Sequence, residues 1–221
     1  MIAKGRRHSI TWRMALATPN FVRALITGCL VGFAVALALP HFFGWIQGKP
    51  GLLLHDPVLA AWGPWDVSTL TFTVLYGTLL LVLISIAKHP LVVIHGLYAY
   101  VLMLLLRMAS MALFTLEPPL GIIPLIDPFT QGFYPGADPF LKDLFFSGHT
   151  ATLAVMALLA NKRVVRWIAV CATVTIGFLV MAQHVHWTVD VVAAFPAAWL
   201  AWKGAGVLLR RAGVPTASED A

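Results

Sequence analysis

Two short segments carry the residues best suited to chemistry. The first runs Asp143-Leu-Phe-Phe-Ser-Gly-His149-Thr150 and the second runs His186-Trp-Thr-Val-Asp190-Val. His186 and Asp190 stand at positions i and i+4, a spacing that brings two side chains together if the segment is helical. A carboxylate on one ring nitrogen fixes the tautomer and leaves the other nitrogen basic and nucleophilic. Because a second histidine can divide acid and base duties with the first near neutral pH, the candidate catalytic residues are His149, His186 and Asp190.

A further group of residues is suited to holding a phosphate. Ser147 and Gly148 can begin a helix, with Ser147 as the N-cap, and the free N–H groups of a helix start bind anions. Arg107 lies in an apolar stretch and therefore needs an anionic partner. A structural ion pair with Asp143 or Asp190 would satisfy it, and so would a bidentate contact to a phosphate. The candidate phosphate-binding residues are Arg107, Asp143, Ser147 and Gly148.

The other ionisable residues near these segments have plainer interpretations. His184 would point elsewhere on a helix than His186, so we expect packing or a loop contact rather than catalysis. His95 is expected to be a buried polar contact inside an apolar stretch. Glu117 could orient a substrate head group, although a solvated loop acid is the simpler interpretation.

The composition places these residues in a membrane protein. Of the 221 residues, 60% are hydrophobic and only 11% are charged, and the mean hydropathy is +0.85. Soluble domains carry roughly 25% charged residues, so this chain has too little polar surface for a water-soluble particle. Helices and closed barrels are the structures that satisfy their backbone groups in lipid. Because the apolar stretches are long and unbroken rather than alternating, we predict an all-α polytopic membrane protein.

Six stretches are candidates for membrane-spanning helices, each of which needs about 20 mostly apolar residues. They are Val22–Pro40, Thr69–Ala87, Leu91–Leu116, Ser147–Ala160, Trp167–Gln183 and Thr188–Leu209. The fourth is short for a span. The predicted organisation is a basic amino-terminal segment (1–21), a six-helix catalytic domain (22–209) and a disordered tail (210–221).

Lysine and arginine predict the orientation of these helices, because they are enriched in cytoplasmic loops. Basic residues occur in the amino-terminal segment, after spans two and four, and in the tail: Lys4, Arg6, Arg7, Arg13, Arg23, Lys88, Lys162, Arg163, Arg166, Lys203, Arg210 and Arg211. The alternate loops hold only Lys49 and Lys142 as basic residues and collect acids: Asp56, Asp66, Glu117, Asp127, Asp138 and Asp143. We therefore predict that both termini are cytoplasmic and that the loops His41–Asp66 and Glu117–Phe146 face outward. This topology places the segments 143–150 and 186–191, which open spans four and six, at the same outer membrane boundary, so we expect them to be spatial neighbours. The net charge of +6 reflects this topology and not a nucleic-acid partner.

The first span has one alternative interpretation. A basic start, an apolar run and the triplet Ala36-Leu37-Ala38 are also features of a cleavable signal peptide. The apolar run is nevertheless long enough to span, and cleavage would leave the later loops where they are. The small pair Gly28 and Gly32 predicts a helix-packing contact in this span.

The two cysteines, Cys29 and Cys171, lie inside apolar runs. That placement argues against a disulfide framework. We expect both to be buried small residues.

With these residues in view, the sequence resembles the sphingomyelin synthase family, a branch of the type 2 phosphatidic acid phosphatase superfamily. A family motif C-G-D-x-x-x-S-G-H-T matches Asp143–Thr150 from its Asp onward, and a motif H-Y-T-x-D-V matches His186–Val191 with Trp187 in place of Tyr. A third pattern, Arg followed by T-L-P-x-P, resembles Arg107 and then Thr115–Pro119. The resemblance covers residues from about Leu91 to Phe195. Residues beside the motifs depart from the family, namely Leu141, Lys142 and Glu117, and Phe146 stands where a phosphatase would have Pro.

The resemblance implies a metal-independent transfer of a lipid phosphate or phospho-head-group, without a cofactor. By analogy, His186 attacks the phosphorus with Asp190 as its orienting carboxylate, and His149 protonates the departing alkoxide. Arg107 and the helix start at Ser147–His149 would stabilise charge on the phosphate oxygens. The expected partners are a phospholipid donor and a lipid alcohol acceptor such as ceramide or diacylglycerol. The expected location is the extracytoplasmic face of a bacterial inner membrane.

Three other functions remain open from the sequence. The same residues with water as acceptor would make a lipid phosphatase or a phospholipase C-like hydrolase. Paired histidines can bind haem, although those here lie at span ends rather than mid-span. A transporter could line its pathway with Arg107 and the histidines, but it would be expected to show inverted repeats or broken helices.

Overall fold

The computed structural model describes residues 10–125, 127 and 140–215. The basic residues Lys4, Arg6 and Arg7, the acid Asp138 and the tail residues 216–221 lie outside the described residues, as do residue 126 and the whole segment 128–139. Predictions that fall on those residues stay predictions. The tail was predicted to be disordered from residue 210, and for its first residues that prediction was wrong, because Arg210 and Arg211 are helical and Val214 is buried.

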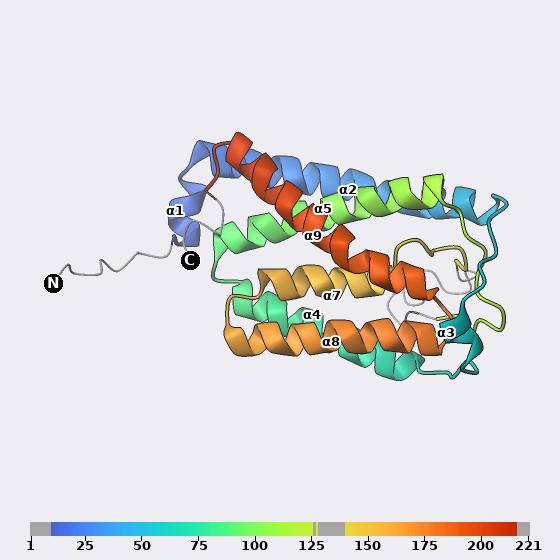
Figure 1. The fold of residues 1–221 in the computed structure, drawn as a ribbon. Coiled ribbons are helices and arrows are strands. Elements are labelled where there is room, and N and C mark those ends of the chain that lie inside the picture. Colours follow the sequence, from blue (N-terminus) through green and yellow to red (C-terminus); the bar gives the residue numbers. More distant parts are fainter. Residues whose placement is uncertain (1–9, 126, 128–139, 216–221) are drawn as a thin grey trace.

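The described chain is helical and runs as a bundle whose long helices lie side by side (Figure 1). An isolated bridge between Leu52 and Leu116 joins two loops. The helices, in chain order, are α1 (Trp12–Leu16), α2 (Pro19–Gln47), α3 (Pro57–Ala60), α4 (Ser68–Ile86), α5 (Pro90–Leu113), α7 (Gly148–Leu159), α8 (Arg163–Ala182) and α9 (Thr188–Arg211).

The prediction of an all-α protein is confirmed, and six apolar helices lie where six spans were predicted. Within the described ranges, five of them are long and apolar enough to cross a membrane: α2, α4, α5, α8 and α9. The sixth, α7, has 12 residues and is shorter than a span.

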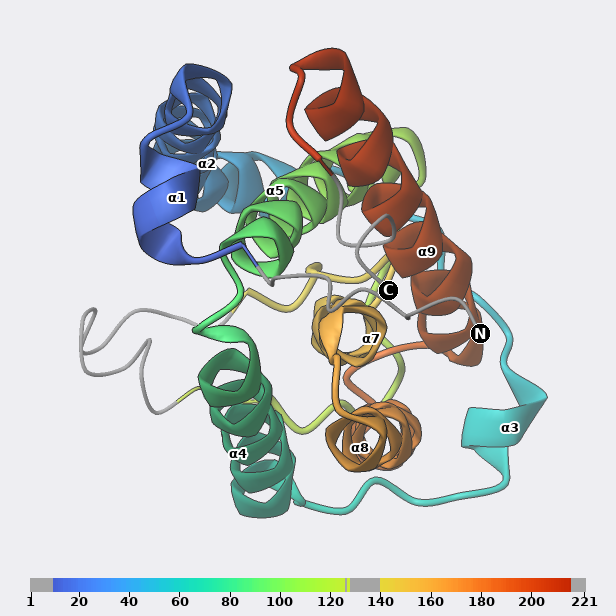
Figure 2. The same cartoon turned by 90° about the vertical axis from the view of Figure 1, so that its left-hand side faces the viewer.

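The short helix α7 lies at the centre of the bundle. Viewed from one end, it is surrounded by α4, α5, α8 and α9, while α2 lies on the far side of α5 (Figure 2). Most of its side chains are buried against these neighbours. Its amino-terminal end stops short of the ends of α5 and α8 (Figure 1), so the residues that begin α7 are recessed within the bundle.

Helix α2 differs from the predicted first span, because it continues through Pro40 to Gln47. Residues 41–47 were predicted as outer loop, and that prediction was wrong. Proline is tolerated within membrane helices, and tertiary contacts hold the added turns. Ile46 is 1% exposed, and the Gln47 side-chain oxygen accepts backbone hydrogen bonds from Leu141 and Lys142 at 3.1 and 3.2 Å.

The small residues of α2 pack as predicted. A Cβ atom at Gly28 would lie 2.8 Å from the Tyr98 ring, and one at Gly32 would lie 3.2 Å from Val101. Both glycines therefore permit the close approach of α2 to α5.

The prediction that both cysteines are buried was wrong. Cys29 and Cys171 are free, as expected, but they are exposed. Both lie on helix faces that this chain leaves uncovered.

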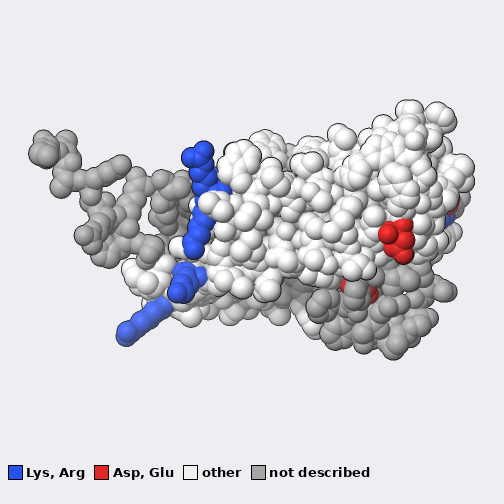
Figure 3. Space-filling view, turned by 90° about the horizontal axis from the view of Figure 1, so that it is seen from below, with Lys and Arg blue, Asp and Glu red and all other residues white. Residues whose placement is uncertain are grey.

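Charged residues separate along the bundle. Figure 3 shows most of the visible lysine and arginine at the end near α1, and acidic residues toward the other end, where Lys142 also lies beside Glu117. The basic end holds Lys88 after α4 and Lys162 before α8. The opposite end, called here the acidic end, holds α3 and the amino termini of α4, α7 and α9 (Figure 1).

Candidate active site

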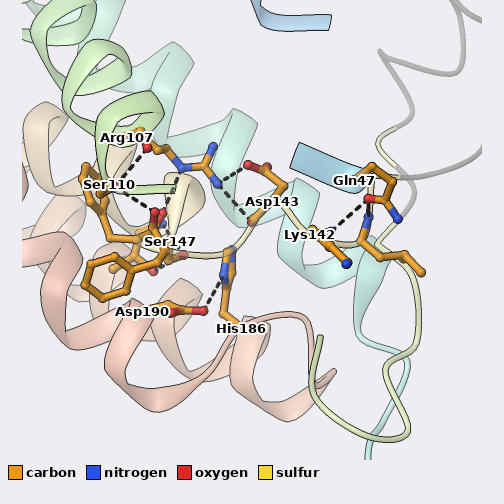
Figure 4. A network of polar contacts seen from close by, with 12 residues as sticks. Gln47, Arg107, Ser110, Lys142, Asp143, Ser147, His186 and Asp190 are labelled. Carbon is orange, nitrogen blue, oxygen red and sulfur yellow. Dashed lines mark hydrogen bonds and ion pairs between the residues drawn. The ribbon is translucent and has the colours of Figure 1, made fainter. Parts of the chain in front are cut away.

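Five of the predicted site residues, Arg107, Asp143, Ser147, His186 and Asp190, come together at the acidic end of the bundle (Figure 4). Arg107 is contributed by α5, His149 by the first turn of α7, and Asp190 by the first turn of α9. The rings of His149 and His186 have centroids 6.2 Å apart and planes inclined by 65°. The two sequence segments are therefore spatial neighbours, as their topology suggested.

His186 and Asp190 form a buried pair. The Nδ1 atom of His186 lies 3.4 Å from Oδ2 of Asp190, and the two side chains are 1% and 0% exposed. The same carboxylate oxygen accepts the backbone N–H of Trp187 at 3.0 Å. The other ring nitrogen, Nε2, is buried and has no hydrogen-bond partner among the described residues. This arrangement leaves Nε2 available to react.

His149 is the second residue of α7. Its ring meets the Phe72 ring edge-on, with centroids 6.2 Å apart, and its Nδ1 atom is buried with no hydrogen-bond partner in the described part of the chain. Phe72 in turn stacks on Tyr76. The imidazole is thus held by ring contacts on the α4 side and faces His186 on the other.

Arg107 is bound within the protein at one edge of the site. Its Nη2 atom forms an ion pair with Oδ1 of Asp143 at 2.6 Å and donates to the Asp143 carbonyl at 3.1 Å. Its Nε atom donates to the Phe146 carbonyl at 2.8 Å. Of the two partners left open by the sequence, Asp143 is the observed one. The guanidinium covers Gly148, where a Cβ atom would lie 2.7 Å from the Arg107 Cζ.

Ser147 is the N-cap of α7, as predicted. Its hydroxyl oxygen accepts from the Thr150 N–H at 3.4 Å and from the Thr150 hydroxyl at 3.1 Å. Its own backbone N–H donates to the Asp190 carbonyl at 3.0 Å. The Ser147 N–H is therefore occupied by α9, which directs any anion binding at this helix start to Gly148 and His149.

A cavity of about 230 Å³ opens beside these residues. Its polar lining includes Tyr76 and Tyr100, which the sequence did not single out, and Asp127, which was noted only as an acid of an outer loop. The Tyr76 hydroxyl donates to Asp127 at 2.6 Å. Neither tyrosine belongs to a recognisable motif, so only their position beside His149 identifies them. A smaller pocket of about 70 Å³ is lined by both His149 and His186.

A long apolar groove of about 590 Å³ adjoins the first cavity, and three residues line both: Leu79, Tyr100 and Thr152. The groove, called here the apolar groove, runs between α4, α5 and α7 toward Trp12 and Ala87 near the basic end. Its other walls are almost entirely hydrocarbon, including Leu83, Val93 and Leu97. An apolar chain attached to a group beside His149 could lie along it.

Loops at the acidic end are tied together around the site. Both ring nitrogens of His184 lie near backbone carbonyls, Nδ1 3.0 Å from Leu120 O and Nε2 3.2 Å from Trp62 O, so the predicted loop contact is confirmed. The prediction for His95 is also confirmed, since it is buried and its Nε2 lies 2.9 Å from Trp202 O.

Glu117 is not the simple solvated acid that was expected. Its Oε1 atom accepts from the Lys142 ammonium at 2.7 Å and from the Gly51 N–H at 2.8 Å. The hydrogen bond from Lys142 holds the pKa of Glu117 below its ordinary value. Glu117 therefore links the loop after α5 to the residue that precedes Asp143.

Comparison with protein families bears on the same region. Residues 142–205 match the family model described as PAP2 superfamily C-terminal. This match supports membership of the PAP2 superfamily. The matched range begins one residue before Asp143 and contains His149, His186 and Asp190. A comparison with curated proteins gave no match.

The match to the PAP2 superfamily model suggests a phosphatase-type lipid enzyme, with phosphatase or phosphotransferase activity. The apolar helices and the superfamily match together indicate an integral membrane protein. The geometry fits this chemistry, because two histidines, one carboxylate and one arginine converge beside a cavity that continues into an apolar groove.

Proposed function

We propose that the protein is a membrane-embedded lipid head-group phosphotransferase of the sphingomyelin synthase type. The observation that carries the proposal is the buried His186 Nε2, which has no partner among the described residues and lines one pocket with His149. A carboxylate on Nδ1 and an open Nε2 form the arrangement that activates a histidine nucleophile.

The reaction runs in two displacements. His186 Nε2 attacks the phosphorus of the donor lipid, an N–P bond forms, and the bond from phosphorus to the diacylglycerol oxygen breaks. His149 delivers a proton to that departing oxygen. The acceptor alcohol then loses its proton to His149 and attacks phosphorus, which breaks the N–P bond and restores His186. No metal takes part in either step.

In this proposal the Arg107 guanidinium stabilises the negative charge on the phosphate oxygens. The guanidinium is held by Asp143 and by two carbonyl groups, so it needs little reorganisation when the substrate binds. In this proposal Asp143 acts through Arg107, because a carboxylate does not bind a phosphate directly. The backbone N–H groups of Gly148 and His149 face the same charge from the start of α7.

The apolar groove supports a lipid substrate. It adjoins the cavity beside His149 and is walled by leucine and valine side chains. We assign it to an acyl chain of the donor or the acceptor.

The charge distribution supports an outward-facing site. Lysine and arginine mark the cytoplasmic side of membrane proteins, and they gather at the end opposite the site (Figure 3). We place the site on the extracytoplasmic face, with both termini inside, and the compact chain in a bacterial inner membrane.

A lipid panel tests the proposal. Purified protein would be incubated with head-group-labelled phospholipids, with and without ceramide or diacylglycerol, beside variants His149→Ala, His186→Ala and Asp190→Asn. Transfer predicts a labelled lipid product that forms only when the lipid alcohol is present and is lost in the three variants. His41→Ala is the matched control, since His41 is an exposed histidine on α2.

Hydrolysis is the alternative that the same panel detects. Release of free phosphate or of the free phosphorylated head group, independent of added alcohol, would replace the transferase with a lipid phosphatase or phospholipase C-like enzyme. If none of the tested lipids turned over, both would be contradicted.

A further inference from the structure

The turn that joins α8 to α9 is held by a carboxylate from the first outer loop. Asp56 accepts two hydrogen bonds from Thr188, one at Oδ2 from the backbone N–H (2.7 Å) and one at Oδ1 from the hydroxyl (3.1 Å). Thr188 is the first residue of α9 and lies between His186 and Asp190 in the chain. Asp56 thus contacts the turn that carries both members of the histidine–carboxylate pair.

Helix α9 needs an acceptor from elsewhere at its start. The first N–H groups of a helix have no partner within the helix, and a Ser, Thr, Asp or Asn at the N-cap ordinarily accepts from one of them. The N-cap of α9 is Trp187, whose side chain has no oxygen. Asp56 supplies the acceptor from a distant part of the sequence, and its negative charge is favourable at a helix amino terminus.

The position of Asp190 relative to His186 depends on this helix start. Asp190 lies inside the first turn of α9, whereas His186 lies before the helix begins. The Oδ2 atom of Asp190 serves both His186 Nδ1 at 3.4 Å and the Trp187 N–H at 3.0 Å. If the first turn of α9 frayed, the carboxylate would move while the imidazole stayed with the preceding turn.

The Asp56 side chain is itself fixed in place. Its Oδ1 atom accepts the Val58 and Leu59 N–H groups at 3.0 and 3.3 Å, which makes Asp56 the N-cap of α3. Leu59 is buried in a cluster with Trp187. Burial works to raise the pKa of Asp56, but the hydrogen bonds from Thr188, Leu59 and Val58 bring it below its ordinary value. The carboxylate is therefore charged at neutral pH.

We propose that Asp56 is a positioning residue that acts through Thr188 to keep Asp190 against Nδ1 of His186. It contacts no reacting atom in this assignment. The inference rests on the proposed function, in which His186 is the nucleophile and needs its proton on Nδ1. It also gives Thr188 a role, because its hydroxyl is the second donor to the Asp56 carboxylate.

The test is the tautomer of His186, which does not depend on knowing the substrate. Full-length protein with ¹⁵N-labelled histidine would be reconstituted in nanodiscs, and the His186 signal would be identified by its loss in His186→Gln. The wild type is expected to hold the proton on Nδ1. Asp190→Asn and Asp56→Ala are expected to shift the signal in the same direction, toward a mixture of tautomers.

A matched control is available in Asp66. Its Oδ1 atom accepts the backbone N–H and the hydroxyl of Ser68, at 3.0 and 2.7 Å, at the start of α4. This is the same kind of contact at the same end of the bundle, on a helix whose first turn holds no member of the pair. Asp66→Ala should leave the His186 signal unchanged. An Asp56→Ala signal at the wild-type position, or one that Asp66→Ala reproduces, would overturn the proposal.

Turnover supplies a second readout. Asp56→Ala should lower kcat by about tenfold to a hundredfold, the range expected when a small displacement misaligns reacting groups, with KM nearly unchanged. Asp56→Asn keeps one oxygen acceptor, so its kcat should fall less than that of Asp56→Ala. This variant also provides the test if Asp56→Ala does not fold.

If the wild type turns over no lipid but the ¹⁵N signals respond as expected, the proposed function fails and the positioning role stands. If turnover is normal and the signals do not respond, the positioning role fails alone.

Discussion

The guanidinium of Arg107 and the carboxylate of Asp143 form an ion pair of 2.6 Å that joins α5 to the segment before α7. The Arg107 side chain is 8% exposed and that of Asp143 is 28% exposed. Asp143 thus neutralises a cation that lies among apolar helices, and it fixes the direction in which the cation faces the cavity.

Asp143→Ala should therefore destabilise the protein, because it leaves Arg107 buried without its counter-charge. Breaking a buried pair in this way costs about 3 kcal/mol. Glu117→Gln at the more exposed pair with Lys142 should cost about 1 kcal/mol or less. Thermal unfolding in detergent measures both. Equal losses for the two variants would contradict the structural role assigned to the Arg107 pair.

Gly148→Ala should reduce turnover sharply while the protein stays folded. The added Cβ would lie 2.7 Å from the Arg107 Cζ, so the guanidinium would have to move from the edge of the site. Gly77→Ala is the control, since nothing lies within 4 Å of a Cβ at that position in α4. The measurement is kcat/KM for both variants, and an active Gly148→Ala enzyme would show that the Arg107 position is unimportant.

Val93→Trp should impair long-chain substrates more than short-chain ones, because Val93 lines the apolar groove. We expect KM to rise with acyl chain length in this variant, with little change for a water-soluble analogue that lacks the chains. Leu80→Trp is the matched control on the lipid-facing side of α4, where Leu80 is 60% exposed. A variant whose losses do not depend on chain length would remove the groove from the substrate path.

Acid should loosen the contacts that Glu117 makes with Lys142 and Gly51. The pKa of Glu117 is lowered from 4.5, chiefly by the hydrogen bond from Lys142. A lowered carboxyl pKa means that the stabilisation is complete above the ordinary value and is lost as the pH falls through the folded-state pKa. The Tm difference between wild type and Glu117→Gln should therefore shrink below about pH 4.5. A constant difference from pH 7 to pH 3 would contradict this.

The sequence predicted the helices and the meeting of the two histidine segments because both follow from the apolar runs and the charge of the turns. Alternating spans place His149 and His186 at one end of the bundle without any knowledge of packing. The i, i+4 spacing of His186 and Asp190 likewise predicted a contact, although His186 lies before the helix rather than within it.

Contacts that depend on tertiary packing could not be predicted in this way. The added turns of α2 are held by Gln47, whose partners lie in a distant loop. Asp56 was noted only as an acid in an outer loop, since nothing local shows that it caps α9. Of the two possible partners for Arg107, the sequence could not select Asp143, because that choice depends on where the segment before α7 enters the bundle.

The central claim is that His186 carries the phosphorus during turnover, and trapping the intermediate tests it most directly. Protein mixed briefly with a head-group-³²P phospholipid, without acceptor, would be quenched in alkali, digested and analysed by mass spectrometry. The account predicts label on the peptide that contains His186, absent in His186→Ala and discharged when a lipid alcohol is added. Label on His149 or on another residue, or rapid transfer with no labelled protein, would contradict it.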